Sequence, residues 1–193
     1  MNSTDAVRRL MESLESTATK YVLVGALASN VYSISRSTKD ADVVVAFEAG
    51  VLNRLLDALG PDFRFNPQMM IEVLTGSIRN EITFLPTGFL IDLFRLSDDI
   101  HHRALVDRRV RAYVSEIALE VWVPTVEDIV VQKVRWGRRK DQDDVVNILS
   151  LNHEQLDWDY VFGWTDSHGT SPLLRQLSKE VPGLQFPPEQ SPG

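Results

Sequence analysis

Three aspartates are the residues of this chain whose types and spacing best suit chemistry. Asp40 and Asp42 lie two positions apart in an apolar stretch, and Asp92 lies alone in a later one. Carboxylate oxygens are the ligands that hard divalent cations such as Mg²⁺ and Mn²⁺ prefer, and such cations orient and neutralise phosphate groups. The sequence therefore predicts a divalent-metal site built from Asp40, Asp42 and Asp92.

Strand periodicity predicts how the three carboxylates point. If residues 40–47 form a strand, alternation puts Asp40 and Asp42 on one face, where a cation between them would relieve their repulsion. Residues 80–85 and 89–96 read as a hairpin around a Pro-Thr-Gly turn. Alternation puts Asp92 on one face of the strand with Leu90 and Phe94, and a carboxylate amid apolar neighbours needs a partner. The partner is either the metal or an arginine at the edge of the hairpin, Arg79 or Arg95.

A turn ahead of these strands suits a phosphate. Residues 21–24 are apolar and strand-like, Gly25 closes them, and residues 26–34 can be helical. The N–H groups at such a helix start favour anions, and Gly25 lets backbone approach a ligand. Arg36, in the next loop, could contact a phosphate or pair with a carboxylate, and we favour the carboxylate.

A second constellation of charged residues lies downstream. Thr125 is a good N-cap, so a helix should begin there. At about 100° per residue, Lys133, Lys140 and Asp144 fall within roughly 40° of one another, provided that Gly137 does not break the helix. Lys133 would hold a phosphate while Lys140 and Asp144 orient it or the substrate. The alternative is a solvated charge run with i,i+4 pairs.

Two segments in this order resemble a known superfamily. Residues 23–28, Leu-Val-Gly-Ala-Leu-Ala, and residues 36–42, Arg-Ser-Thr-Lys-Asp-Ala-Asp, look like the first motif of the DNA polymerase β-like nucleotidyltransferases in their small bacterial form. Residues 124–144 are similar to the lysine-containing motif of abortive-infection (AbiEii-type) toxins and uncharacterised relatives. The resemblance spans roughly residues 20–150.

This resemblance implies an α/β (α+β) nucleotidyltransferase fold, a twisted mixed sheet flanked by helices. It implies Mg²⁺- or Mn²⁺-dependent transfer of a nucleotidyl group from an NTP. The residues that it implies are Asp40, Asp42 and Asp92 as metal ligands, Gly25 and Ala26 at the triphosphate, and Lys133 and Asp144 as accessory groups. Asp92 is the candidate for activating the acceptor. Because Gly25-Ala26 replaces the usual Gly-Gly or Gly-Ser, the alternative is a catalytically inactive nucleotide-binding or protein-interaction module.

The length and net charge of the chain limit the possible domain organisation and the possible acceptors. The 193 residues fit one domain, with a core over 1–120, a helical segment over 121–180 that completes the cleft, and a disordered tail over 181–193. A net charge of −7 argues against a general nucleic-acid surface. An RNA acceptor such as tRNA would need a local patch, and the candidates are Arg135, Arg138, Arg139 and Lys140. A protein or small-molecule acceptor stays open, as does a toxin role with a cognate antitoxin.

The chain contains no cysteine, which excludes disulfides and thiolate metal sites. No stretch resembles an export signal or could span a bilayer. We therefore expect a cytoplasmic protein with no membrane partner.

Overall fold

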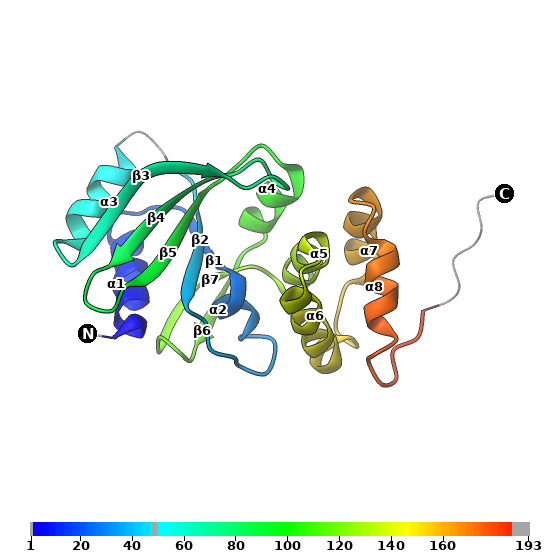
Figure 1. Cartoon of the computed structure of the whole chain (residues 1–193). Coiled ribbons are helices and arrows are strands. Elements are labelled where there is room, and N and C mark those ends of the chain that lie inside the picture. The colour runs from blue at the N-terminus through cyan, green and yellow to red at the C-terminus, as the bar shows by residue number, and fades with distance from the viewer. Residues whose placement is uncertain (1, 48–49, 187–193) are drawn as a thin grey trace. The chain divides into compact units, whose positions relative to one another are not determined.

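The computed structural model describes residues 2–47 and 50–186, and the chain divides into two compact units (Figure 1). Unit 1 comprises residues 1–31 and 35–125, and unit 2 comprises residues 32–34 and 126–193. No helix in the described part of the chain is long and apolar enough to cross a membrane.

In its described residues, unit 1 contains four helices and two sheets. Its elements are α1 (Ser3–Ser16), β1 (Tyr21–Val24), α2 (Gly25–Ser29), β2 (Asp40–Val45), α3 (Val51–Leu59), β3 (Phe63–Ile71), β4 (Ile78–Phe84), β5 (Phe89–Arg95), α4 (Ile100–Asp107), β6 (Val110–Val114) and β7 (Leu119–Val123). The main sheet has the strand order β1-β2-β5-β4-β3, and β6 pairs with β7 separately. All neighbours in the main sheet are antiparallel except β2 and β5, which are parallel. The predicted class, a mixed sheet flanked by helices, is confirmed.

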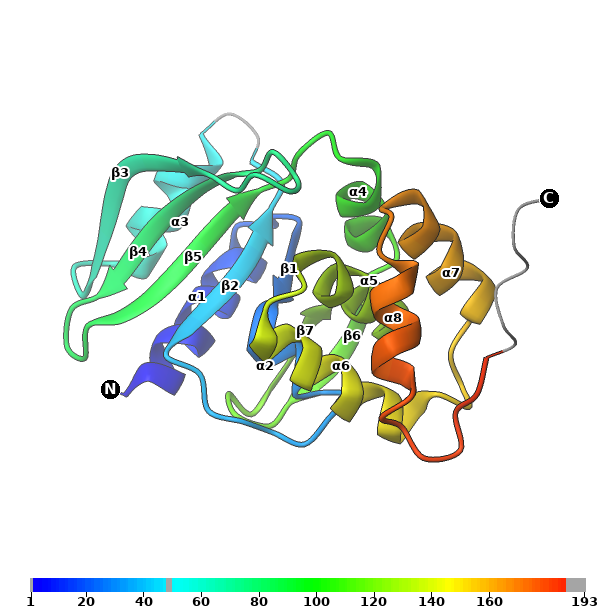
Figure 2. The same ribbon diagram turned by 45° about the vertical axis from the view of Figure 1, so that its right-hand side comes forward.

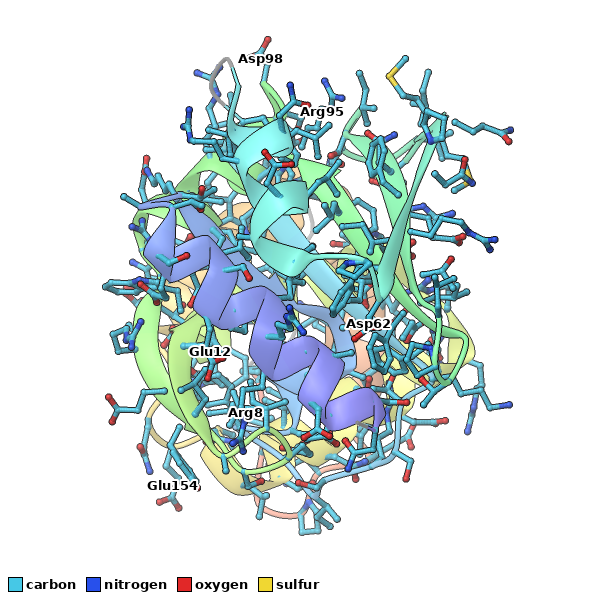
Figure 3. The ribbon with its side chains drawn as sticks, turned by 90° about the vertical axis from the view of Figure 1, so that its left-hand side faces the viewer. Arg8, Glu12, Asp62, Arg95, Asp98 and Glu154 are labelled. Carbon is cyan, nitrogen blue, oxygen red and sulfur yellow. The ribbon has the colours of Figure 1, made fainter. Side chains whose placement is uncertain are left out.

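One face of the main sheet carries the core. Alternation puts Val43, Ile82 and Ile91 on the same face, and all three are fully buried. Helices α1 and α3 cover this face (Figure 3). Their apolar stripes, which include Leu10 and Leu55, have no exposed surface, as expected for amphipathic helices packed on a sheet.

The opposite face is apolar only near one end. There α4 supplies Leu105 and Val106, which form a buried cluster with β-strand residues Val22, Val24 and Val44. Beyond this cluster, the same face carries mostly polar residues, which are Asp40 and Asp42 on β2, Asp92 on β5 and Glu81 on β4, together with the apolar Leu90 on β5. The change from apolar to polar residues occurs along β2, which lies between β1 and β5 (Figure 2).

Side-chain hydrogen bonds fix the start of α1 and the loop after α2. The first helix is capped by Asn2, whose side chain accepts from the backbone of Asp5 in a capping box. Helix α2 ends at Ser29 and is shorter than the expected 26–34. The segment between α2 and β2 is instead a loop that Asn30 fixes, because its side chain bonds both the N–H and the carbonyl of Arg36.

Unit 2 is helical. Its elements are α5 (Val126–Trp136), α6 (Arg139–Asn152), α7 (Trp158–Ser167) and α8 (Ser171–Ser178). Of the tail expected from residue 181 onwards, residues 181–186 are described: Val181 is buried, and the ring of Phe186 lies 4.6 Å from that of Trp158. Residues 187–193 lie outside the described part.

Candidate active site

The main sheet brings the carboxylates from separate segments together. Asp40 and Asp42 occupy alternate positions on β2, and Asp92 on β5 is the register partner of Asp42. Residues paired in register on neighbouring strands point to the same face. Asp42 and Asp92 therefore stand side by side on the polar part of the sheet, with Asp40 one step along β2.

Gly25 presses backbone against this group. Its φ is +67°, in the left-handed region, and a Cβ built on it would lie 2.0 Å from Oδ2 of Asp42. A side chain at this position would therefore meet both backbone strain and a collision. The turn after β1 thus has a glycine because Asp42 occupies the space next to it.

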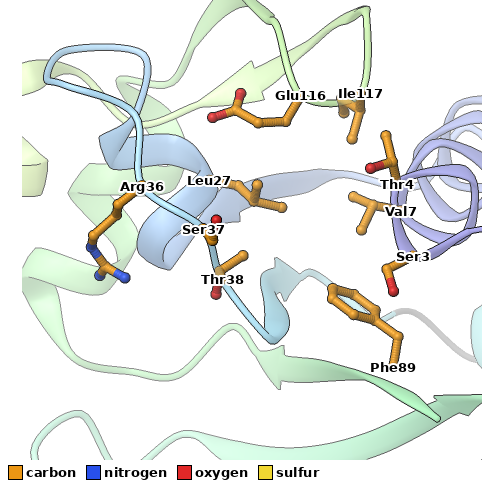
Figure 4. Close-up of a pocket in the computed structure, with 10 residues that line it drawn as sticks. All are labelled: Ser3, Thr4, Val7, Leu27, Arg36, Ser37, Thr38, Phe89, Glu116 and Ile117. Atoms are coloured by element: carbon orange, nitrogen blue, oxygen red, sulfur yellow. The ribbon is translucent and has the colours of Figure 1, made fainter. Parts of the chain in front are cut away.

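The loop ahead of β2 holds Asp40. The hydroxyl of Thr38 donates to Oδ1 of Asp40 over 2.7 Å. Thr38 and Arg36 also line a cavity of about 210 Å³. Figure 4 shows the guanidinium of Arg36 pointing away from the apolar residues of that cavity, such as Leu27 and Phe89.

Asp92 is paired with Arg79, the simpler of the two partners considered from sequence. Nη1 of Arg79 donates to Oδ2 of Asp92 over 2.5 Å, while Oδ1 of Asp92 is buried and has no hydrogen-bond partner. Burial raises the pKa of Asp92 above its usual value, Arg79 opposes that rise, and the negative charges of Glu81 and Asp40 add to it. One carboxylate oxygen is therefore satisfied and the other is left for a further ligand.

The donors suit a hard cation, although no site is preformed. Within residues 2–47 and 50–186, no three His, Cys, Asp or Glu side chains are arranged to hold a metal ion. The aspartates nevertheless lie on neighbouring positions of one face, and the unpaired Oδ1 of Asp92 needs a positive partner. The residues therefore fit a divalent cation that would draw the carboxylates together.

Sequence reasoning missed Glu81 on β4. Glu81 is the register partner of Asp92 on the side away from Asp42, and its side chain is half-buried. The alternation Arg79, Glu81, Thr83 within a predicted strand was the signal that could have identified a polar face there.

In unit 2 the downstream motif forms a buried ionic cluster. Gly137 has φ +61° and separates α5 from α6, so the condition on which the helical-face argument depends is not met. The two helices nevertheless pack together, and Nζ of Lys133 lies 2.6 Å from Oδ2 of Asp144 and 3.6 Å from Oδ1 of Asp141. Lys133 is only 4% exposed, whereas Arg139 and Asp143 form an exposed i,i+4 pair, as the alternative of a solvated charge run expects.

The basic run considered for RNA is paired largely with acidic neighbours. Arg138 bonds Asp141 over 2.5 Å, and its guanidinium lies 4.6 Å from the ring centre of Trp136. Arg139 pairs with Asp143 over 3.2 Å. Lys140 is exposed.

Residues 4–168 match the family described as "Nucleotidyltransferase of unknown function" (DUF6036), and the chain belongs to that family. The protein is therefore a nucleotidyltransferase by family.

Solved structures agree with this fold. ANT(2'')-Ia in complex with adenylyl-2''-tobramycin is 13% identical, with a TM-score of 0.57, 88% of this chain covered and 98% of the other. An antigenic nucleotidyltransferase-like protein from Paracoccidioides brasiliensis is 18% identical, with a TM-score of 0.54 and 93% of each chain covered. JHP933 from Helicobacter pylori is 15% identical, with a TM-score of 0.51, 94% of this chain covered and 82% of the other. No curated protein matches the chain in sequence.

The first prediction concerns Gly25. Gly25→Ala should displace Asp42 and lower the stability by more than the roughly 1–2 kcal/mol of left-handed strain alone. Gly88→Ala is the matched control, because Gly88 has φ +70° and, among the described residues other than its chain neighbours, no atom lies within 4 Å of a Cβ built on it. Urea unfolding of both variants checks the difference, and equal losses would contradict the collision with Asp42.

The second prediction concerns Arg79. Arg79→Met should cost about 1–3 kcal/mol at about pH 8, because it leaves the buried, ionised Asp92 without its donor. The pKa of Asp92, already raised, should rise further, so its ionisation opposes folding more strongly above that pKa. The loss should therefore shrink as the pH is lowered towards about pH 4, because protonation of Asp92 removes the charge that Arg79 balances.

Urea unfolding at both pH values measures this effect. Lys20→Met is the control, because Lys20 and its partner Asp107 are both exposed and such pairs contribute little. A loss in Arg79→Met that is the same at both pH values would show that Asp92 does not depend on Arg79.

The third prediction concerns Lys133. Lys133→Met should cost about 3–5 kcal/mol, since it removes the buried ammonium group that lies beside the carboxylates of Asp144 and Asp141. Lys140→Met, the exposed control on the same motif, should change stability little. Thermal unfolding compares the two, and an unchanged melting temperature in Lys133→Met would rule out a structural role for the cluster.

Proposed function

We propose that the protein transfers a nucleotidyl group from an NTP to an acceptor hydroxyl with the aid of Mg²⁺ or Mn²⁺. The observation that carries this proposal is the pairing of Asp42 with Asp92 on adjacent strands, with one oxygen of Asp92 buried and unpartnered. The family supports nucleotidyl transfer as the reaction class.

Asp40, Asp42 and Asp92 are the residues that would hold the cation. A divalent cation supplies charge neutralisation for the triphosphate and lowers the pKa of a bound hydroxyl. Gly25 and Ala26 would present backbone to the triphosphate, because the turn after β1 lies against Asp42 and carries no side chain that blocks approach.

Asp92 is proposed to take the proton of the acceptor. The acceptor oxygen attacks the α-phosphorus, a new P–O bond forms, the bond to the β-phosphate breaks, and pyrophosphate leaves with its electron pair. The proton of the attacking hydroxyl passes to the Asp92 carboxylate. A pKa raised by burial suits this role, since a base works best when its pKa approaches the working pH.

Lys133 is proposed to act through structure, since Asp144 and Asp141 hold its ammonium group within unit 2. A direct contact between Lys133 and a phosphate would require this buried pairing to open. Arg36 stays a candidate for a phosphate or carboxylate contact, and Lys140 for the nucleotide.

The finer expectations stay predictions. These are an RNA or protein acceptor, a toxin role with a cognate antitoxin, and a location in the cytoplasm. ANT(2'')-Ia, the structural neighbour seen with adenylyl-2''-tobramycin, makes a small-molecule acceptor a further candidate for this chain.

The fourth prediction tests the cation and the nucleotide together. Calorimetric titration with a non-hydrolysable NTP should show binding that requires Mg²⁺ or Mn²⁺, and Asp42→Asn should abolish it because one of the paired carboxylates is lost. Asp57→Asn, an exposed position on α3, is the matched control and should bind normally. Affinity that depends on neither the metal nor Asp42 would refute the site.

The alternative, an inactive module on the same fold, gives a different result in the same preparation. Metal-dependent NTP binding without release of pyrophosphate in the presence of cell extract would support it. Release of pyrophosphate that Asp92→Asn suppresses, while NTP binding persists, would support the enzyme.

A further inference from the structure

The polar face of the main sheet continues beyond the aspartates. Asp42, Asp92, Glu81 and Asn66 are successive register partners on β2, β5, β4 and β3. They therefore form one row across four strands, with side chains on the same face. Asp42 lies at the Gly25 side of this row, so an acceptor that reaches Asp92 has the β4 and β3 side left to occupy.

A hollow lies on that side. It has a volume of about 290 Å³, and Arg64, Asn66, Glu81 and Thr83 are among the residues that line it. The side chains of Arg64 and Glu81 make no ion pair or hydrogen bond with any other residue that the structure describes. Arg64 and Glu81 carry opposite charges, and both border this hollow. They are therefore the groups that would orient a ligand there.

Leu90 adds an apolar surface to this polar face of the sheet. It lies between Asp40 and Thr83 in register, and it remains 38% exposed. It shares the face of Asp92, two positions along β5. We name Arg64, Asn66, Glu81, Thr83 and Leu90 the acceptor platform.

We propose that the acceptor platform binds the acceptor, and that this acceptor is a small polyol ring with a protonated amine close to the reacting hydroxyl. This inference rests on the proposed function, because it assumes that Asp92 receives the hydroxyl proton. Glu81 stands one register step from Asp92, about 5 Å between neighbouring strands, and its carboxylate receives the amine. Leu90 contacts the apolar face of the ring, and Thr83 and Asn66 bond its hydroxyls.

Charge separates this acceptor from RNA. A phosphodiester beside Glu81 would meet a half-buried carboxylate with no cation attached to it, and that repulsion favours a cationic ligand. Arg64, at the far side of the hollow, is the only unpaired cation among the platform residues, and a hydroxyl or a single anionic group of the ligand satisfies it.

A pair of sugars that differ in one group tests the proposal. Glucosamine and glucose are titrated at about pH 7 into the full chain loaded with Mg²⁺ and a non-hydrolysable NTP, and binding is followed by NMR. Glucosamine should bind about tenfold more tightly than glucose, the size expected for one charged hydrogen bond. Glu81→Gln should remove that preference, whereas Glu120→Gln, an equal change at an exposed site on β7, should keep it.

Three results would overturn the inference: binding of neither sugar, equal binding of both, or a preference that survives Glu81→Gln. Preferential labelling of RNA by labelled NTP would also overturn it. Calorimetry of the wild type with NTP and Mg²⁺, run beside the sugar titrations, keeps the two proposals apart. Loss of metal-dependent NTP binding in the wild type would instead refute the proposed function itself.

Discussion

The parallel pairing of β2 with β5 is the constraint on which the site depends. It places Asp42 and Asp92 next to each other, where two ionised carboxylates repel and each loses hydration. An isolated pair of this kind would oppose folding. The fold tolerates it because Arg79 holds one oxygen of Asp92 and Thr38 donates to Asp40. Oδ1 of Asp92 still has no hydrogen-bond partner among the described residues. A cation that binds this oxygen would offset part of the unfavourable free energy of burying the two carboxylates.

The same pairing accounts for the topology around it. Parallel neighbours cannot be joined by a tight turn, so the chain must cross from the end of β2 to the start of β5. That connection contains α3, which covers the core face, and then β3 and β4, which extend the sheet on the far side of β5. The crossover therefore also builds the surface that carries Arg79 and Glu81. The connection between the parallel strands β2 and β5 therefore supplies both Arg79, which balances the charge of Asp92, and most of the acceptor platform.

Local patterns predicted the elements, and long-range pairing decided the contacts. The alternation around Asp42 and the turn before β5 are short-range signals, and the strands that they predict are present. The adjacency of Asp42 and Asp92 depends on register between segments far apart in the chain, which spacing cannot supply. The same limit applied to Lys133 and Asp144. They meet across two helices separated by Gly137, although the periodicity argument assumed a single helix.

Charge is distributed differently in the two units, and this decides where a ligand gains most. In unit 2, Lys133, Arg138, Asp141 and Asp144 neutralise one another, so a phosphate entering there would have to break existing pairs. In unit 1, Asp92 has one unpaired oxygen, and Glu81 and Arg64 pair with no described residue. Binding energy comes from groups that are unsatisfied before the ligand arrives, because satisfied pairs lose as much as they gain. Cation, nucleotide and acceptor are therefore expected to meet on the sheet of unit 1, and the buried ions of unit 2 stabilise its helices.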